Sequence, residues 1–189
     1  MRRTLFVVAA LAFIASCAPY QLVEPPKRVQ ISDTYTVSPQ VKWSRVNNTF
    51  FKNVEQWTVD GAGLQALMFI NNVEDGQPIF RSRRATKIPV FRSSMNTLEI
   101  KELFENSMAA MRAQKVKVRK FKPTKFGNAD GFRFTFTYKT KGGLDKQGVA
   151  RGSIRNKKLY LIVYMGTRLH YYGKYRRAAE GVMRSVRFL

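Results

Sequence analysis

The segment Phe132-Arg133-Phe134-Thr135-Phe136-Thr137-Tyr138-Lys139 carries the clearest structural signal in the chain. Aromatic and polar side chains alternate along it, as they do in a strand with one buried and one exposed face. A second signal follows, because Gly148–Arg155 and Lys158–Met165 flank the two-residue turn Asn156-Lys157. Residues 132–165 therefore predict the centre of an antiparallel sheet.

The segments before this centre predict further strands and one helix. The strand candidates are rich in β-branched and aromatic residues. They are Val41–Val46, Val54–Val59, Leu64–Val73 and Val116–Phe121. Asn96, followed three residues later by Glu99, has the form of a capping box, and apolar residues then continue at helical spacing. This pattern predicts a helix over about 96–114.

The C-terminal segment predicts a second helix over about 167–187. Its apolar side chains recur at helical spacing. They are Tyr171, Tyr175, Ala178, Val182 and Val186. In the predicted hairpin, small residues such as Gly148 and Gly152 oppose large ones such as Leu161, which leaves a trough on one sheet face. We expect the second helix to lie in this trough.

The order of these elements predicts an α+β fold in which an antiparallel β-sheet packs against two main helices. The chain has 189 residues, enough for a single compact domain but too few for a second one. In its element order, the part from 35 to 189 loosely resembles the fold shared by Mog1 and the photosystem PsbP proteins. This resemblance implies an adaptor or assembly protein with no common active site, and it transfers no functional residues.

The N-terminus has the layout of a secretory signal peptide. Arg2 and Arg3 precede an apolar run from Leu5 to Ile14, and small residues follow. The run is too short to cross a bilayer, which takes about 20 apolar residues. The sequence therefore predicts an exported protein.

The end of this leader, Ile14-Ala15-Ser16-Cys17, resembles the lipobox of bacterial lipoproteins. The resemblance implies that residues 1–16 are removed and that Cys17 carries a lipid. Ala18 stands where an Asp would retain a lipoprotein at the inner membrane, so the resemblance implies the outer membrane, and we expect the protein to face the periplasm. The alternative is an ordinary secreted protein cut near Ala18.

The segment 17–34 contains Pro19, Pro25 and Pro26 and shows no periodic apolar pattern. We therefore expect a flexible tether between the lipidated residue and the globular part. The basic α+β domain then occupies residues 35–189.

The chain is strongly basic, with 34 Lys+Arg against 12 Asp+Glu and a formal net charge of +22. After residue 114, Asp130, Asp145 and Glu180 are the only acids. Strand alternation places six basic side chains on one sheet face, as candidate anion-binding residues. They are Lys117, Arg119, Arg133, Lys139, Arg151 and Arg155. Basic loops at Arg81–Lys87 and Lys139–Lys146 extend the expected patch, whereas the alternative is a solvated face that binds nothing.

A surface of this charge predicts an anionic partner. We expect a binding or assembly protein, held at a membrane by its lipid, whose basic face docks on anionic lipid, lipopolysaccharide, wall polymer or an acidic protein. Nucleic acid is not the expected partner, because an exported lipoprotein meets little of it and Phe132–Tyr138 is explained as a core face. DNA handling during uptake or secretion stays open as a further hypothesis.

No catalytic constellation stands out in the sequence. With one Cys and one His, a metal set or a nucleophile–base pair has few components, so we predict no metal, no cofactor and no enzymatic activity. His170 lies near the start of the second helix, where a surface or capping role explains it. The alternative is a hydrolase of wall or lipid components with paired carboxylates. However, Glu74 and Asp75 adjoin a turn, and the acids within 99–105 suit the first turns of a helix.

Overall fold

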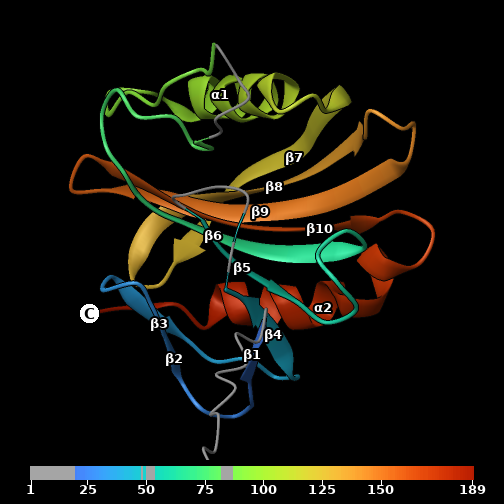
Figure 1. The fold of residues 1–189 in the computed structure, drawn as a ribbon. Helices are drawn as coiled ribbons and strands as arrows, with labels where there is room; N and C mark the ends of the chain where they lie inside the picture. The colour runs from blue at the N-terminus through green and yellow to red at the C-terminus, as the bar shows by residue number, and fades with distance from the viewer. Residues whose placement is uncertain (1–19, 48, 50–53, 82–86) are drawn as a thin grey trace, which may run out of the picture.

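A large antiparallel sheet separates two helices (Figure 1). This computed structural model describes residues 20–47, 49, 54–81 and 87–189. Along the sheet the strands are β1 (Tyr20–Val23), β4 (Trp43–Val46), β5 (Val54–Thr58), β6 (Gln65–Val73), β10 (Lys158–Thr167), β9 (Asp145–Arg155), β8 (Ala129–Lys139) and β7 (Gln114–Phe126). A smaller sheet contains β11 (Arg187–Phe188), β3 (Tyr35–Val37) and β2 (Val29–Ile31). The helices, one on each side, are α1 (Thr97–Ala110) and α2 (Tyr171–Arg184).

The predicted α+β class, with an antiparallel sheet and two helices, is confirmed. Both helices are shorter than expected. The first ends early because Arg112 has a φ of 66°, which is a left-handed conformation that stops a helix. The second begins only at Tyr171, after β10 has continued to Thr167.

The aromatic face of β8 packs against α1. The ring of Phe104 lies 4.9 Å from the rings of both Phe134 and Phe136, in edge-on geometry. The predicted capping box fixes the start of this helix, because the side chains of Asn96 and Glu99 each accept a backbone hydrogen bond from the other residue. The alternating pattern of 132–139 is therefore a core face.

The trough expected in the hairpin is filled from within the sheet. A Cβ atom on Gly148 would lie 2.2 Å from Cζ of Phe136, and one on Gly152 would lie 3.1 Å from Cζ of Phe132. The small residues of β9 thus make room for the rings of β8, and α1 covers them. The prediction that the C-terminal helix lies there is wrong.

The second helix, α2, packs on the opposite face of the sheet. It buries Tyr172, Ala179, Val182 and Met183, a stripe that differs from the expected one. The start of the helix sets this stripe, because the backbone of Tyr172 lies so close to Gly166 that a Cβ there would be 2.8 Å from its nitrogen. The expected stripe is therefore correct in part: Val182 and Val186 are buried and Tyr175 and Ala178 are partly buried against the same core, whereas the expectation left out Tyr172, Ala179 and Met183.

The hairpin turn itself is as predicted. Arg155 pairs with Lys158, and the register continues without a break to Lys146 and Thr167. Asn156 and Lys157 have φ values of 49° and 60°, which a two-residue turn of this hand requires.

The prediction of a flexible tether is wrong for the described part of 17–34. β1 pairs with β4, and β2 pairs with β3. Val23 and Ile31 are buried in the core below α2. The proline-rich segment carries its few apolar residues in two short strands. Neither strand is long enough for its alternation of buried and exposed side chains to be recognised in the sequence.

Cys17 and the leader lie outside the described residues. Within the described ranges, neither helix is long and apolar enough to cross a bilayer.

Candidate anion-binding groove

Ten basic side chains line an open groove of about 760 Å³ beside α2. The groove lies on the α2 side of the sheet, over β7, β8 and β9, because Arg133, Thr135 and Thr137 alternate with the rings that face α1. The basic residues are Lys115, Lys117, Arg119, Lys120, Lys122, Arg133, Lys139, Lys146, Arg168 and Arg176. The acids in the lining are Asp145 and Glu180. The groove is thus strongly cationic.

A β-bulge in β7 keeps the basic side chains on the groove side. The register with β8 shifts between Arg119 and Lys122, and Lys120 has a φ of 52°. The extra residue reverses the alternation. Phe121 therefore joins the α1 face, where its ring stacks on Phe132 at 5.3 Å, and Lys122 lines the groove.

Both acids of the groove are already engaged by cations. The carboxylate of Glu180 accepts hydrogen bonds from Arg133 at 2.6 Å and from Arg176 at 3.1 Å. Burial alone would raise the pKa of Glu180, but these hydrogen bonds and charges outweigh it and hold the pKa below its ordinary value. Asp145 lies 2.8 Å from Nζ of Lys139, whose hydrogen bond lowers the pKa of Asp145.

Six basic side chains of the groove form no ion pair with any residue that the structure describes. They are Lys115, Lys117, Arg119, Lys120, Lys122 and Arg168. Lys146 differs, because its Nζ donates to the backbone oxygens of Gly63 and Leu64, and burial lowers its pKa. An incoming anion therefore meets several cations outside any ion pair, although Asp145 lies near enough to Lys115 and Arg168 for their charges to lower its pKa.

The structure places four of the six predicted residues in the groove. They are Lys117, Arg119, Arg133 and Lys139. Arg151 shares their sheet face but donates to Oγ1 of Thr124 at 2.6 Å, and burial lowers its pKa. Arg155 lies over the ring of Phe188, with its guanidinium carbon 4.4 Å from the ring centre. Neither Arg151 nor Arg155 lines the groove.

The remaining cations of the groove were not among the predicted candidates. Lys122 was missed because a bulge cannot be read from strict alternation. Arg168 comes from the turn between β10 and α2, and Arg176 comes from α2, whose position over the sheet the sequence does not indicate. Of the expected basic loop Lys139–Lys146, the two end residues Lys139 and Lys146 line the groove, whereas Lys141 lines a different pocket. The loop Arg81–Lys87 is different: its ends lie outside the groove lining, and residues 82–86 lie outside the described part.

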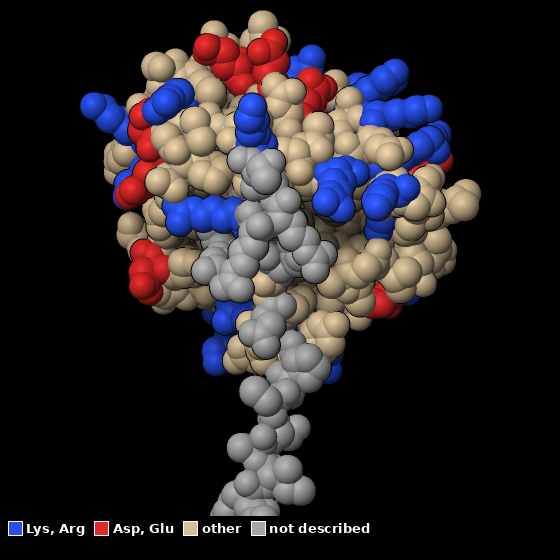
Figure 2. Space-filling view, turned by 45° about the horizontal axis from the view of Figure 1, so that its top comes forward, with Lys and Arg blue, Asp and Glu red and all other residues tan. Residues whose placement is uncertain are grey.

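Basic side chains are not confined to the groove. Figure 2, in which the α1 side comes forward, shows them on that side as well, together with several groups of acidic side chains. What sets the groove apart is therefore the scarcity of free acids within one concave surface.

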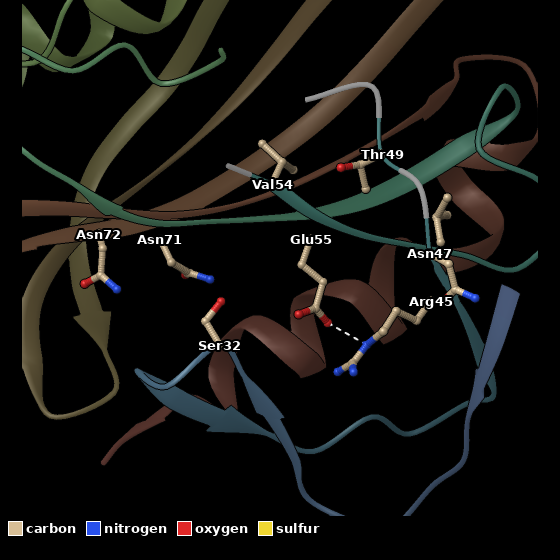
Figure 3. A pocket seen from close by; sticks show the side chains of 9 residues that line it. Ser32, Arg45, Asn47, Thr49, Val54, Glu55, Asn71 and Asn72 are labelled. Atoms are coloured by element: carbon tan, nitrogen blue, oxygen red, sulfur yellow. Dashed lines mark ion pairs between the residues drawn. The ribbon is translucent and has the colours of Figure 1, made fainter. Parts of the chain in front are cut away.

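A second, polar pocket of about 420 Å³ is lined by residues of β4, β5 and β6 (Figure 3). In it, Nε of Arg45 lies 2.9 Å from Oε1 of Glu55, and Nε1 of Trp57 donates to the same oxygen at 2.7 Å. Burial nevertheless raises the pKa of Glu55. Glu55 is the one carboxylate in the described lining, so the lining lacks the second acid of a paired-carboxylate mechanism.

Among the residues the structure covers, no cluster of three His, Cys, Asp or Glu suits a metal ion.

Comparisons with known proteins identify a shared fold. No family model and no curated protein matches this chain. Among solved structures, the solution structure of cyanobacterial PsbP (CyanoP) from Synechocystis sp. PCC 6803 is similar, with a TM-score of 0.56 and 10% sequence identity over 95% of this chain and 99% of that chain. At this identity the likeness concerns the fold alone, and it confirms the expected PsbP-like α+β architecture.

Proposed function

We propose that this chain is a lipid-anchored protein of the bacterial envelope that binds an anionic group through its basic groove. It works as a binding or assembly protein and performs no catalysis. The observation that carries this proposal is the lining of the groove, where ten basic side chains meet two acids that are both paired already.

The concave shape of the groove favours an anion that protrudes from its surroundings. A flat bilayer would touch only the rim, whereas a phosphorylated sugar headgroup can enter between α2 and the bulged strand β7. Phosphates of lipopolysaccharide have this form and suit unpaired Lys and Arg side chains. An acidic protein segment is the competing ligand.

The proposed lipid on Cys17 would hold the domain close to the membrane. β1 begins at Tyr20, three residues after Cys17, a distance of at most about 11 Å for an extended chain. β1 is one edge strand of the large sheet, and β7, which lines the groove, is the other edge strand (Figure 1). A short link would therefore hold the β1 edge of the domain near the outer membrane, with the domain in the periplasm and the groove strands at the other edge of the sheet. The intact mass of membrane-extracted protein, compared with that of a Cys17→Ser variant, tests for the lipid.

Binding to vesicles tests the groove. We suggest phosphatidylcholine vesicles with and without lipopolysaccharide, at low ionic strength, and full-length Cys17→Ser protein. The triple substitution Lys117→Gln, Arg119→Gln and Lys122→Gln should weaken binding about a hundredfold, since each cation near an anionic surface contributes about 1 kcal/mol. The matched control Lys87→Gln, Lys157→Gln and Arg177→Gln removes the same charge from exposed positions outside the groove lining.

Equal weakening by both triple variants would contradict a groove site and favour a diffuse charge effect. Saturable binding of poly-glutamate in place of the vesicles would point to an acidic protein partner. Tight binding of duplex DNA that falls steeply with salt would support the DNA hypothesis instead.

A further inference from the structure

An apolar pocket of about 380 Å³ lies at the C-terminal end of α1, on the side of the sheet opposite the groove floor. Four methionines line it, together with Phe80 and Tyr138. They are Met68, Met108, Met111 and Met165. The chain has 7 methionines, so the pocket gathers more than half of them.

The lining suits a flexible apolar chain. Methionine is unbranched and polarisable, so a group of methionines adapts to ligands of variable shape. Met68 and Met108 are buried, whereas Met111 and Met165 are partly exposed, so a ligand can reach the pocket from solvent. The pocket has the volume of a small-molecule site.

The mouth of the pocket is cationic. Arg112 and Lys141 line it, are exposed, and form no ion pair with any residue in the described ranges. Arg112 has a φ of 66°, a conformation for which glycine is the usual residue after a helix. The chain thus has a charged side chain beside an apolar pocket, at a position where glycine would be less strained.

Tyr138 supplies a hydroxyl group within the pocket. It donates to Sδ of Met165 at 3.1 Å, a weak acceptor, and burial raises the pKa of Tyr138 to about 12. A carboxylate oxygen would be a stronger acceptor for this hydroxyl.

We propose that this pocket binds a fatty acid, with its alkyl chain among the four methionines and its carboxylate at Arg112 and Lys141. The pocket shares only Tyr138 with the described lining of the basic groove, and its ligand goes beyond the proposed docking of anions there. Substitution of Lys117, Arg119 and Lys122 should therefore leave fatty-acid binding unchanged.

Methyl NMR of methionine-labelled protein tests the site without any pocket mutation. We suggest full-length Cys17→Ser protein titrated with decanoate below its micelle concentration. The methyl signals of Met68, Met108, Met111 and Met165 should shift on saturation, whereas those of Met95 and Met183, which do not line the pocket, should not. Absence of shifts, or equal shifts in all six signals, would overturn the proposal.

The dependence on chain length separates burial of the alkyl chain from simple attraction to a basic protein. Each added methylene should strengthen binding about fourfold until the pocket is full. Affinities of hexanoate, octanoate and decanoate that are all equal would contradict burial of the chain.

Two variants test the base and the mouth of the pocket. Ala113→Phe fills the pocket and should abolish binding, whereas Ala109→Phe on the exposed face of α1 should not. Arg112→Gly suits the local backbone and should weaken binding about fivefold without loss of stability. The control Arg177→Gln, which lowers the net charge equally, should have no effect, and loss of binding in this control would overturn the assignment of the mouth.

Discussion

The guanidinium of Arg133 lies 2.6 Å from the carboxylate of Glu180, and this ion pair joins β8 to α2 across the wall of the basic groove. The two side chains are only 17% and 19% exposed, so the pair is well shielded from solvent. Arg176 donates to the same carboxylate. Arg184 lies 3.7 Å from the other oxygen of Glu180, so one acid engages three cations while the groove keeps its excess of positive charge.

Glu180→Gln should affect stability and anion binding in opposite directions. Loss of the carboxylate leaves Arg133 poorly paired, so the free energy of unfolding at pH 7 should fall by about 2 kcal/mol. The groove gains net positive charge, so binding to lipopolysaccharide vesicles should tighten. Urea denaturation and vesicle titration of the same variant measure the two effects.

The pH dependence of this variant follows from the lowered pKa of Glu180. A depressed pKa in the folded state gives a stabilisation that is fully present above the ordinary value of 4.5 and is lost as pH falls through the folded value. The difference in stability between wild type and Glu180→Gln should therefore disappear at strongly acid pH. A difference that stays constant with pH would contradict the assigned ion pair.

Glu55 should show the opposite pH dependence, because burial raises its pKa. Its folded form then binds a proton more tightly than its unfolded form does, so its contribution to stability falls as pH rises from the ordinary value of 4.5 through the folded value. The stability of wild type relative to Glu55→Gln should thus decrease over this range. Thermal unfolding of both proteins between pH 4 and pH 7 would measure the trend, and an increase would refute it.

Gly148 is required for the packing of β8 on β9. In Gly148→Ala the new Cβ would meet the ring of Phe136 at 2.2 Å and the backbone oxygen of Tyr164 at 2.7 Å. We expect a loss of about 2–3 kcal/mol in the free energy of unfolding. Gly173→Ala is the control, since a Cβ there has nothing within 4 Å and alanine favours the helix, so it should stabilise by about 1 kcal/mol.

Lys120 pays a conformational cost for its place in the bulge. Its φ of 52° is unfavourable for any residue with a Cβ, so Lys120→Gly should raise the free energy of unfolding by about 0.5–1 kcal/mol. Lys122→Gly removes the same charge at a position without positive φ and should lower it by a similar amount. Urea denaturation of the two variants compares them directly, and equal effects would argue against the bulge.

Much of the sheet was predictable from the sequence, because its central strands have regular patterns. The alternation of 132–139 and the turn Asn156-Lys157 give the correct strands and register. The cap formed by Asn96 and Glu99 gives the start of α1. In these places local chemistry and tertiary structure agree.

The first strands and the placement of α2 were not predictable in this way. Strands β1 and β2 have only four and three residues, so no period can be read from them. Which face α2 covers depends on the rings of Phe132 and Phe136, which fill the space above the glycines of β9. That is a property of three-dimensional packing.

The candidate site was only partly predictable for the same reason. Lys117 and Arg119 follow simple alternation and were found. Lys122 follows it only after the bulge, and Arg176 reaches the groove from another element. Arg155 obeys the alternation but lies at the far end of its strand, over Phe188.

Lysine footprinting tests the basic groove most directly. Full-length Cys17→Ser protein would be acetylated with and without lipopolysaccharide vesicles, and the modification of each lysine read by mass spectrometry. The account predicts strong protection of Lys117, Lys120 and Lys122, with Lys87 and Lys157 modified as in the free protein. Equal protection of all five lysines, or protection of the last two alone, would contradict it.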